Sequence, residues 1–135
     1  MPTFSHAPLQ IAIYQYLKSD SVLSGLVGDI YDRVPQNAVF PYITIGDISS
    51  KDWSGKTFTG GEYSVKIHVW SREGGRKQAA GIMGRLYNLL HQGSFSVSGH
   101  TLVLSQFTSN DIKLRDDGWT YEGVMIFRMI LQSNS

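Results

Sequence analysis

The segment EYSVKIHVWS, residues 62–71, constrains the fold most because its side chains alternate strictly in character. Successive side chains of a β-strand point to opposite faces, so residues two apart share a face. The pattern predicts a strand with one face on a core and the other largely polar, as in an antiparallel sheet covered on one side. The core face would hold Tyr63, Val65, Ile67 and Val69, and the other face Glu62, Ser64, Lys66, His68 and Trp70.

Three segments carry apolar residues at helical spacing, and each predicts a helix. They are residues 5–20, a short segment over 19–29, and the longest one over 72–93. Gly28 and Gly93 follow the last apolar positions of the second and third segments, where a left-handed residue commonly ends a helix. We expect these two glycines to end their helices.

Gly81 and Gly84 lie inside the longest predicted helix. A glycine at such a position costs about 1 kcal/mol relative to alanine. We expect this cost to be offset by close packing of the helix backbone against the sheet.

Further strands are predicted over residues 30–34 and 40–48, and a long polar loop over Ser49 to Gly61. Two hairpins follow the main helix. The first would turn near Ser98-Gly99 and the second at Asp117-Gly118, a dipeptide typical of tight hairpin turns. The last strand is apolar on both faces, which predicts a central strand or one covered by helix on one side and another subunit on the other.

The order of elements predicts a single domain over residues 1–135 with an α+β fold. Few signals for repeated parallel crossovers are present, so the sheet should be mostly antiparallel, in two layers, with helices packed on one face. A chain of 135 residues with 41% hydrophobic content is sufficient for an ordered core.

Bulk charge and composition exclude several classes of protein. The net charge is +1, from twelve basic and eleven acidic residues, so there is no basic excess to neutralise a nucleic-acid backbone by charge alone. Cysteine is absent, which removes disulfides and thiol chemistry. Neither a signal peptide nor a membrane-spanning stretch is recognisable, so we expect a soluble protein with no membrane partner.

The tripeptide Gly55-Lys56-Thr57 resembles the centre of a phosphate-binding loop. That loop requires a glycine five positions before Gly55, where this chain has Ser50, and a helix directly after it. The residues that follow lead into the predicted 62–71 strand. A polar hairpin loop is therefore favoured, and we expect no bound cofactor.

No catalytic or metal-binding constellation emerges from the remaining polar residues. The four histidines stand apart from one another, and no G-x-S-x-G sequence is present. Clustered carboxylates could hold magnesium or calcium, but Asp116-Asp117-Gly118 is better explained by turn geometry. We therefore expect no catalytic residue and no metal site. The clustered carboxylates around the last predicted hairpin are Asp111, Asp116, Asp117 and Glu122.

Three tryptophans at predicted loop or rim positions favour a surface that becomes buried against a partner. They are Trp53, Trp70 and Trp119, and each could instead cap an end of the core. A basic patch at the start of the main helix and the acidic turn could lie on different faces, as head-to-tail subunit contacts require. The interface candidates are Trp53, Lys56, Phe58, Arg72, Arg76, Lys77, Asp116 and Asp117.

The chain as a whole resembles the tail-completion, or tail terminator, proteins of long-tailed phages and gene transfer agents. The most specific segments are FPYITIGD, EYSVKIHVWS, and the late DDG followed by YEGVMIFR. The resemblance implies a non-enzymatic virion protein, made in the host cytoplasm and located at the head–tail junction. Copies would form a ring, with a hexamer expected, that caps the tail tube, ends its polymerisation and joins the tail to the head.

The partners implied by the resemblance are other copies of the chain, the tail tube protein and a head-side adaptor or stopper protein. DNA could pass through the ring, and the Ser49 to Gly61 loop could dock on a neighbouring subunit or on the tube. Two alternatives remain open from the sequence. The chain could form a head-completion or adaptor ring on the head side of the same junction, or act as a small DNA-binding module.

Overall fold

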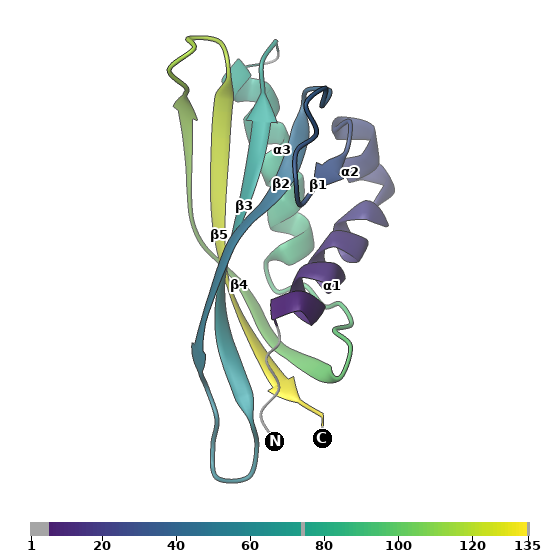
Figure 1. The fold of residues 1–135 in the computed structure, drawn as a ribbon, viewed down its shortest axis with the longest axis vertical. Helices are drawn as coiled ribbons and strands as arrows, with labels where there is room; N and C mark the ends of the chain where they lie inside the picture. Colours follow the sequence, from purple (N-terminus) through teal and green to yellow (C-terminus); the bar gives the residue numbers. More distant parts are fainter. Residues whose placement is uncertain (1–5, 74, 135) are drawn as a thin grey trace.

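A computed structural model describes residues 6–73 and 75–134 of the chain. Within these residues, the elements form an elongated α+β domain in which a five-stranded sheet runs along the long axis (Figure 1). The helices are α1 (His6–Lys18), α2 (Ser21–Leu26) and α3 (Gly75–Leu90), and the strands are β1 (Ile30–Tyr31), β2 (Tyr42–Asp52), β3 (Gly60–Ser71), β4 (His100–Leu114) and β5 (Tyr121–Ser133).

The strand order in the sheet is β1-β2-β3-β5-β4. The short β1 pairs parallel to β2, and the other neighbouring strands are antiparallel. β5 lies between β3 and β4, which confirms the prediction that the last strand is central. This arrangement confirms the mostly antiparallel α+β fold expected from the sequence.

The alternation predicted for residues 62–71 is confirmed by burial. Val65, Ile67 and Val69 are fully buried on the side of the sheet that faces the helices. Val65 pairs with Phe127 of β5, which is also fully buried at the centre of the core. The opposite face of the sheet carries mostly polar side chains and has no helix over it (Figure 1).

Helix α3 approaches the sheet closely, but through a glycine of the sheet. A Cβ atom on Gly123 of β5 would lie 2.5 Å from the sulfur of Met83, so any other residue there would force this side chain to move. Gly81 and Gly84 are exposed, with no neighbouring atom within 4 Å of an added Cβ. The expectation that they permit close packing was wrong, because they lie on the solvent side of the helix.

The helix ends also differ from expectation. Helix α2 is followed by Val27 in an extended conformation, and the left-handed residue after α3 is Gln92, with φ of 56°. Gly28 and Gly93 are therefore not the left-handed stops. A tertiary hydrogen bond holds Gln92 in place, since its N–H donates to the Ser105 carbonyl oxygen of β4 at 2.7 Å.

The segment after α3 contains one hairpin and not two. Near Ser98-Gly99 only an isolated bridge joins Val97 to His100. β4 then runs unbroken from His100 to Leu114, through the boundary expected between the two hairpins. Two shifts of register interrupt its pairing with β5, one between Leu102 and Leu104 and the other between Phe107 and Ser109. The hairpin at Asp117-Gly118 is confirmed, with Gly118 at φ of 73°.

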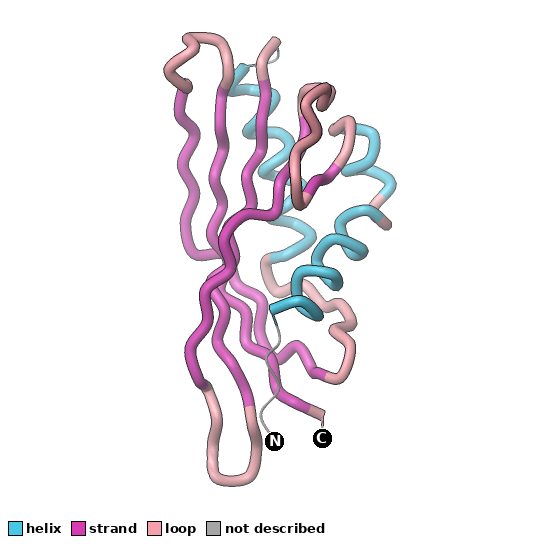
Figure 2. The backbone as a smooth tube through the Cα atoms, viewed as in Figure 1, coloured by secondary structure: helices cyan, strands magenta, loops and turns pink. Residues whose placement is uncertain are grey.

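β2 and β3 form a long hairpin that extends beyond the helices (Figure 2). Both strands continue further than the sequence indicates, so the predicted Ser49 to Gly61 loop shortens to residues 53–59. None of the helices in the described part of the chain is long and apolar enough to span a membrane.

Candidate functional site

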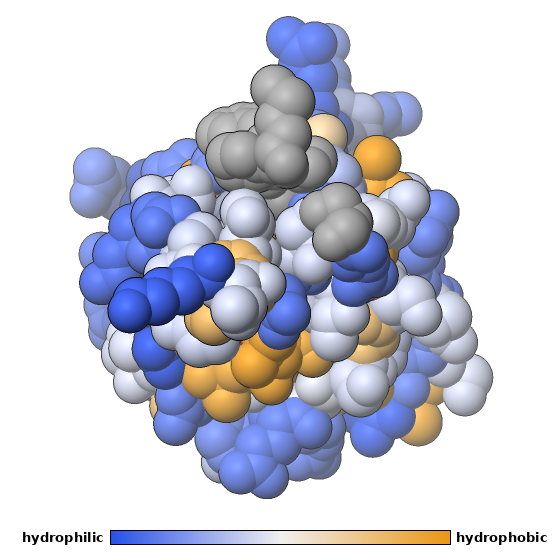
Figure 3. Space-filling model, turned by 90° about the horizontal axis from the view of Figure 1, so that it is seen from below, coloured by the Kyte–Doolittle hydropathy of each residue, from blue (hydrophilic) through white to orange (hydrophobic). Residues whose placement is uncertain are grey.

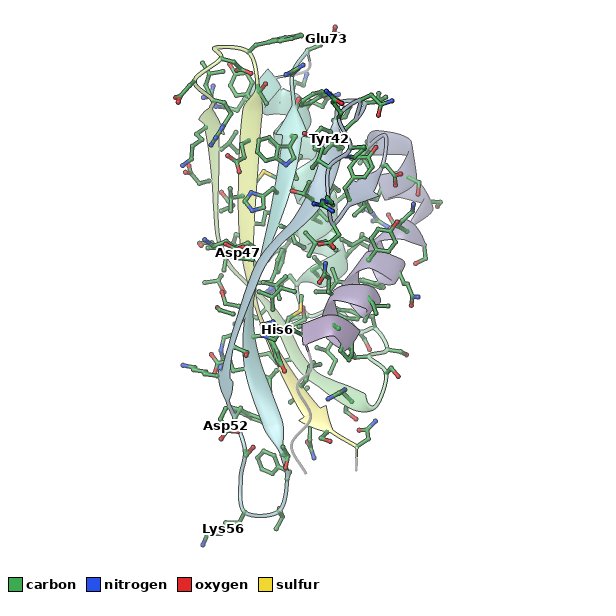
Figure 4. The ribbon with its side chains drawn as sticks, viewed as in Figure 1. His6, Tyr42, Asp47, Asp52, Lys56 and Glu73 are labelled. Carbon is green, nitrogen blue, oxygen red and sulfur yellow. The ribbon has the colours of Figure 1, made fainter. Side chains whose placement is uncertain are left out.

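The predicted interface residues lie at opposite ends of the long axis (Figure 4). Lys56 marks the tip of the β2–β3 loop at one end, and Glu73 lies at the other. We call residues 53–59 the hairpin end, and residues 72, 73 and 75–77 with 115–120 the turn end. Trp53, Lys56 and Phe58 belong to the hairpin end, and Arg72, Arg76, Lys77, Asp116 and Asp117 to the turn end.

The hairpin end is closed by its own backbone and rings. The N–H of Trp53 donates to the Gly60 carbonyl oxygen at 3.0 Å, and the N–H of Gly55 donates to the Phe58 carbonyl oxygen at 3.1 Å. The rings of Trp53 and Phe58 lie 5.2 Å apart between centroids, and both side chains are half-buried. Lys56 is exposed and forms no ion pair with any described residue.

The turn end is organised around the guanidinium of Arg72. Its Cζ lies 4.1 Å from the centroid of the Phe40 ring and 4.2 Å from that of the Trp119 ring. The Nε of Arg72 also donates to the hydroxyl of Thr120 at 3.0 Å. Trp119 is 53% exposed, so one face of this large ring covers Arg72 while the rest is accessible.

Asp117 shapes the turn as predicted. It accepts hydrogen bonds from the Thr120 hydroxyl at 2.6 Å, the Thr120 N–H at 2.8 Å and the Trp119 N–H at 2.9 Å. These bonds, the Thr120 hydroxyl first among them, lower the pKa of Asp117 to about 2. Arg72 lies 4.0 Å away and contributes to the same shift.

The basic and acidic candidates are not segregated to different faces. Arg72 and Asp117 approach each other within one subunit, so the expected separation of opposite charge was wrong at this end. The reason is topological, because β3 and β5 are neighbours and the β3–α3 connection lies beside the β4–β5 turn. Arg76 stacks over Tyr121 at 5.0 Å, while Lys77 is exposed.

Sequence reasoning did not identify a polar network on the open sheet face beside the turn end. Glu122 is only 7% exposed and accepts from Arg115 Nη1 at 2.8 Å, while its other oxygen lies 2.7 Å from His68 Nδ1. Trp70 stacks near His68, and its indole N–H donates to the Thr44 hydroxyl at 3.0 Å. The registers of β2 with β3 and of β3 with β5 bring Thr44, His68 and Glu122 together, and Arg115 reaches Glu122 across the β4–β5 turn.

The described residues include no group of three or more histidine, aspartate or glutamate side chains placed to hold a metal ion. Three acids of the predicted group interact with other side chains. Asp117 accepts hydrogen bonds within the turn, Glu122 contacts Arg115 and His68, and Asp111 lies 4.0 Å from Lys113. The Gly55-Lys56-Thr57 tripeptide leads into strand β3 and not into a helix. The polar side chains at the two ends of the domain therefore stabilise exposed surfaces.

The family model for tail completion protein gp17 matches residues 11–132. The chain belongs to this family. The tail completion protein gp17 of Bacillus phage SPP1 is 27% identical over 128 residues, and the match covers 93% of each chain. A chain from the solved virion of a native gene transfer agent particle has a TM-score of 0.88 at 26% identity, covering 96% of this chain and 98% of that one.

These comparisons confirm the resemblance to tail-completion proteins. Family membership gives the chain a structural role in a phage-type tail, as a component of the virion. The two ends and the open sheet face are therefore considered below as contact surfaces.

Proposed function

We propose that copies of this chain form a closed ring, with a hexamer expected, that caps the tail tube, ends its polymerisation and joins the tail to the head. The observation that carries the proposal is the family match, which extends over residues 11–132. A protein that completes a tail has to contact the tube on one side and the head-side assembly on the other.

The geometry of the subunit supports this role. A junction between two different partners requires two different surfaces on each subunit, held at a fixed distance. The hairpin end and the turn end are such a pair, since they differ in chemistry and lie at opposite ends of one continuous sheet (Figure 4). Strands β3 and β5 pair from Gly60 to Ser71, which links the two ends rigidly.

A ring of identical subunits also needs contacts in which one surface meets a different surface of the next copy. The polar sheet face without a helix over it and the projecting β2–β3 hairpin are available for such contacts (Figure 1). Exposed Trp119 at the turn end is suited to a further partner, because aromatic residues are enriched at protein interfaces. We assign the turn end to the head-side adaptor or stopper protein and the hairpin end to subunit and tube contacts.

Cryo-electron microscopy of intact particles tests the proposal. We expect density for this chain as a ring between the last tube ring and the head-side adaptor. Density within the adaptor ring itself would support the head-completion alternative, and the absence of this chain from the junction would refute both. Salt-dependent binding of the purified protein to DNA would instead favour a DNA-binding module.

A further inference from the structure

A groove lies between helix α1 and the edge of the sheet formed by β1 and the first part of β2. One hollow of about 460 Å³ is lined by Ile11, Tyr14, Ile30 and Asp32 among others, and a second of about 410 Å³ continues from it past Val34 and Asp47. Asp32 and Ile45 line both hollows, so the two adjoin at the edge of the sheet, the first on the side of α1 and the second beside Thr44 and His68. We call the two hollows together the α1–β2 groove.

The first hollow is mostly apolar, the second is mixed and includes Thr44 and His68, and the groove carries the carboxylates of Asp32 and Asp47. Ile11 is 56% and Val34 is 41% exposed, so apolar surface at both hollows faces solvent. Asp32 accepts a hydrogen bond from the Gln10 amide, and neither Asp32 nor Asp47 forms an ion pair with a described residue. Apolar surface beside unneutralised carboxylates fits an occupant that brings both apolar surface and a cation.

The edge of β2 at the groove is also only partly covered. β1 pairs with β2 at Ile43 and Thr44 alone, and β2 continues beyond that point to Asp52. An unpaired stretch of strand edge presents backbone N–H and C=O groups that another chain can use. The groove thus offers apolar, acidic and backbone contacts side by side.

The hairpin end has the complementary composition. Lys56 is exposed at its tip and forms no ion pair within residues 6–73 and 75–134, and the half-buried Trp53–Phe58 pair belongs to the same loop. The tip projects away from the subunit that carries it, whereas Asp47 lies near the middle of the molecule (Figure 4). Seen from that end, residues of high and intermediate polarity cover most of the surface, and apolar residues gather in a band below its centre (Figure 3).

We propose that the hairpin end of one copy docks in the α1–β2 groove of the next, with Lys56 between Asp32 and Asp47. The aromatic pair Trp53–Phe58 then packs near Ile11 or Val34 at the mouth of the groove. The contact joins two different surfaces of the chain, so it repeats from copy to copy. It closes into a ring when the tip and the groove lie at the same height along the ring axis, which requires the long axis of each subunit to be inclined to the ring axis. This inference rests on the proposed ring and specifies which surfaces form it.

Charge reversal tests the electrostatic part. Lys56→Glu places a third carboxylate against Asp32 and Asp47, and we expect the amount of this chain recovered in purified particles to fall about tenfold or more. The triple variant Lys56→Glu with Asp32→Lys and Asp47→Lys restores the charge relationship and should recover most of the incorporation. Asn88→Glu, which adds a carboxylate at an exposed position of α3 that belongs to none of the proposed contact surfaces, serves as the control. Loss without rescue by the triple variant would overturn the pairing of these groups.

Cross-linking in assembled particles tests the contact directly. The natural chain has no cysteine, so Asp32→Cys combined with Lys56→Cys gives a clean background for a short bis-maleimide. We expect a ladder of covalent oligomers of this chain on a denaturing gel, and monomers only for the control pair Lys77→Cys with Lys56→Cys.

A ring seen at the junction without the ladder would overturn the groove contact and leave the proposed function standing. Cross-links from the Asp32→Cys groove to the tube protein in place of this chain would show that the tube protein is the occupant and would overturn the inference. Absence of this chain from the junction would overturn the proposed function and the inference with it.

Discussion

Arg72 and Trp119 are in direct stacking contact, with 4.2 Å between the guanidinium carbon and the centroid of the indole ring. The contact ties the β3–α3 connection to the β4–β5 turn, two segments about fifty residues apart in the sequence. Phe40 covers the other face of the same guanidinium at 4.1 Å. The turn end is therefore a preorganised surface in which one arginine fixes the position of an exposed aromatic ring.

Replacing Trp119 should separate folding from assembly. An exposed cation–π contact contributes about 0.5–1 kcal/mol, so Trp119→Ala should lower the free energy of unfolding by no more than about that amount. We expect the same variant to leave head joining strongly impaired, since the ring is the largest exposed group at the turn end. Urea unfolding and electron-microscopic counts of joined particles measure the two effects. As a control, Leu114→Ala removes another exposed apolar side chain and should change neither the free energy of unfolding nor head joining. Normal head joining by Trp119→Ala would contradict the assignment of the turn end to the head-side partner.

The turn should respond to acid through Asp117. Its carboxylate is stabilised by hydrogen bonds in the folded chain, so its pKa lies at about 2, below the ordinary value of 3.8. Because the pKa of Asp117 is lowered on folding, its carboxylate stabilises the folded chain above about pH 4, and this stabilisation is lost as the pH falls through about 2. Thr120→Val removes the hydroxyl that contributes most, and we expect the pKa of Asp117 to rise towards 3.8. A carboxyl titration by NMR checks this, and an unchanged midpoint in Thr120→Val would contradict the account of the turn.

Asp20 links helices α2 and α3, and its removal should destabilise the domain. Its Oδ2 accepts from the Leu23 N–H as the N-cap of α2 and also from Arg85 Nε at 2.9 Å. Loss of an N-cap side chain costs about 1 kcal/mol, and Asp20→Ala also leaves Arg85 without its partner. We expect Asp20→Ala to lower the free energy of unfolding by about 1–3 kcal/mol. Asp20→Asn keeps a capping oxygen and should cost less; equal losses would show that the cap is unimportant.

The hairpin end should become better protected when the ring forms. Its amides are held in the free chain only by local hydrogen bonds such as Gly55 N–H to the Phe58 carbonyl, which local opening breaks easily. Docking in a neighbouring copy should therefore slow amide hydrogen exchange over residues 53–59. Exchange followed by mass spectrometry in free and assembled protein measures this, with the amides of α3 as the internal reference. Equal protection of residues 53–59 in both states would count against docking.

The elements that sequence predicted well are those in which a local pattern and the tertiary environment agree. The 62–71 strand alternates because one face meets the core and the other is open. The Asp117-Gly118 turn is specified locally, since Gly118 adopts a positive φ and Asp117 accepts hydrogen bonds from the two residues after the glycine. Both features are therefore recognisable from a short stretch of the sequence.

The misplaced elements have identifiable physical causes. The sequence predicts two shorter strands in place of β4 because two register shifts put the alternation out of phase, so no single period runs along the strand. It predicts a loop at the end of β2 because Ser49 to Asp52 are exposed and carry no apolar face. The Arg72–Trp119 and Glu122–His68 contacts depend on strand register, which a single sequence does not provide.

Imaging of tails made in the absence of this chain tests the central claim most directly. The measurement is the length distribution of tail tubes, and the presence of heads on them, in particles from a deletion strain and from the same strain with the gene restored. We predict tubes that are longer than normal and lack heads, returning to uniform length and joined heads on restoration. Tails of normal length joined to heads in the deletion strain would contradict a role in ending the tube and joining it to the head.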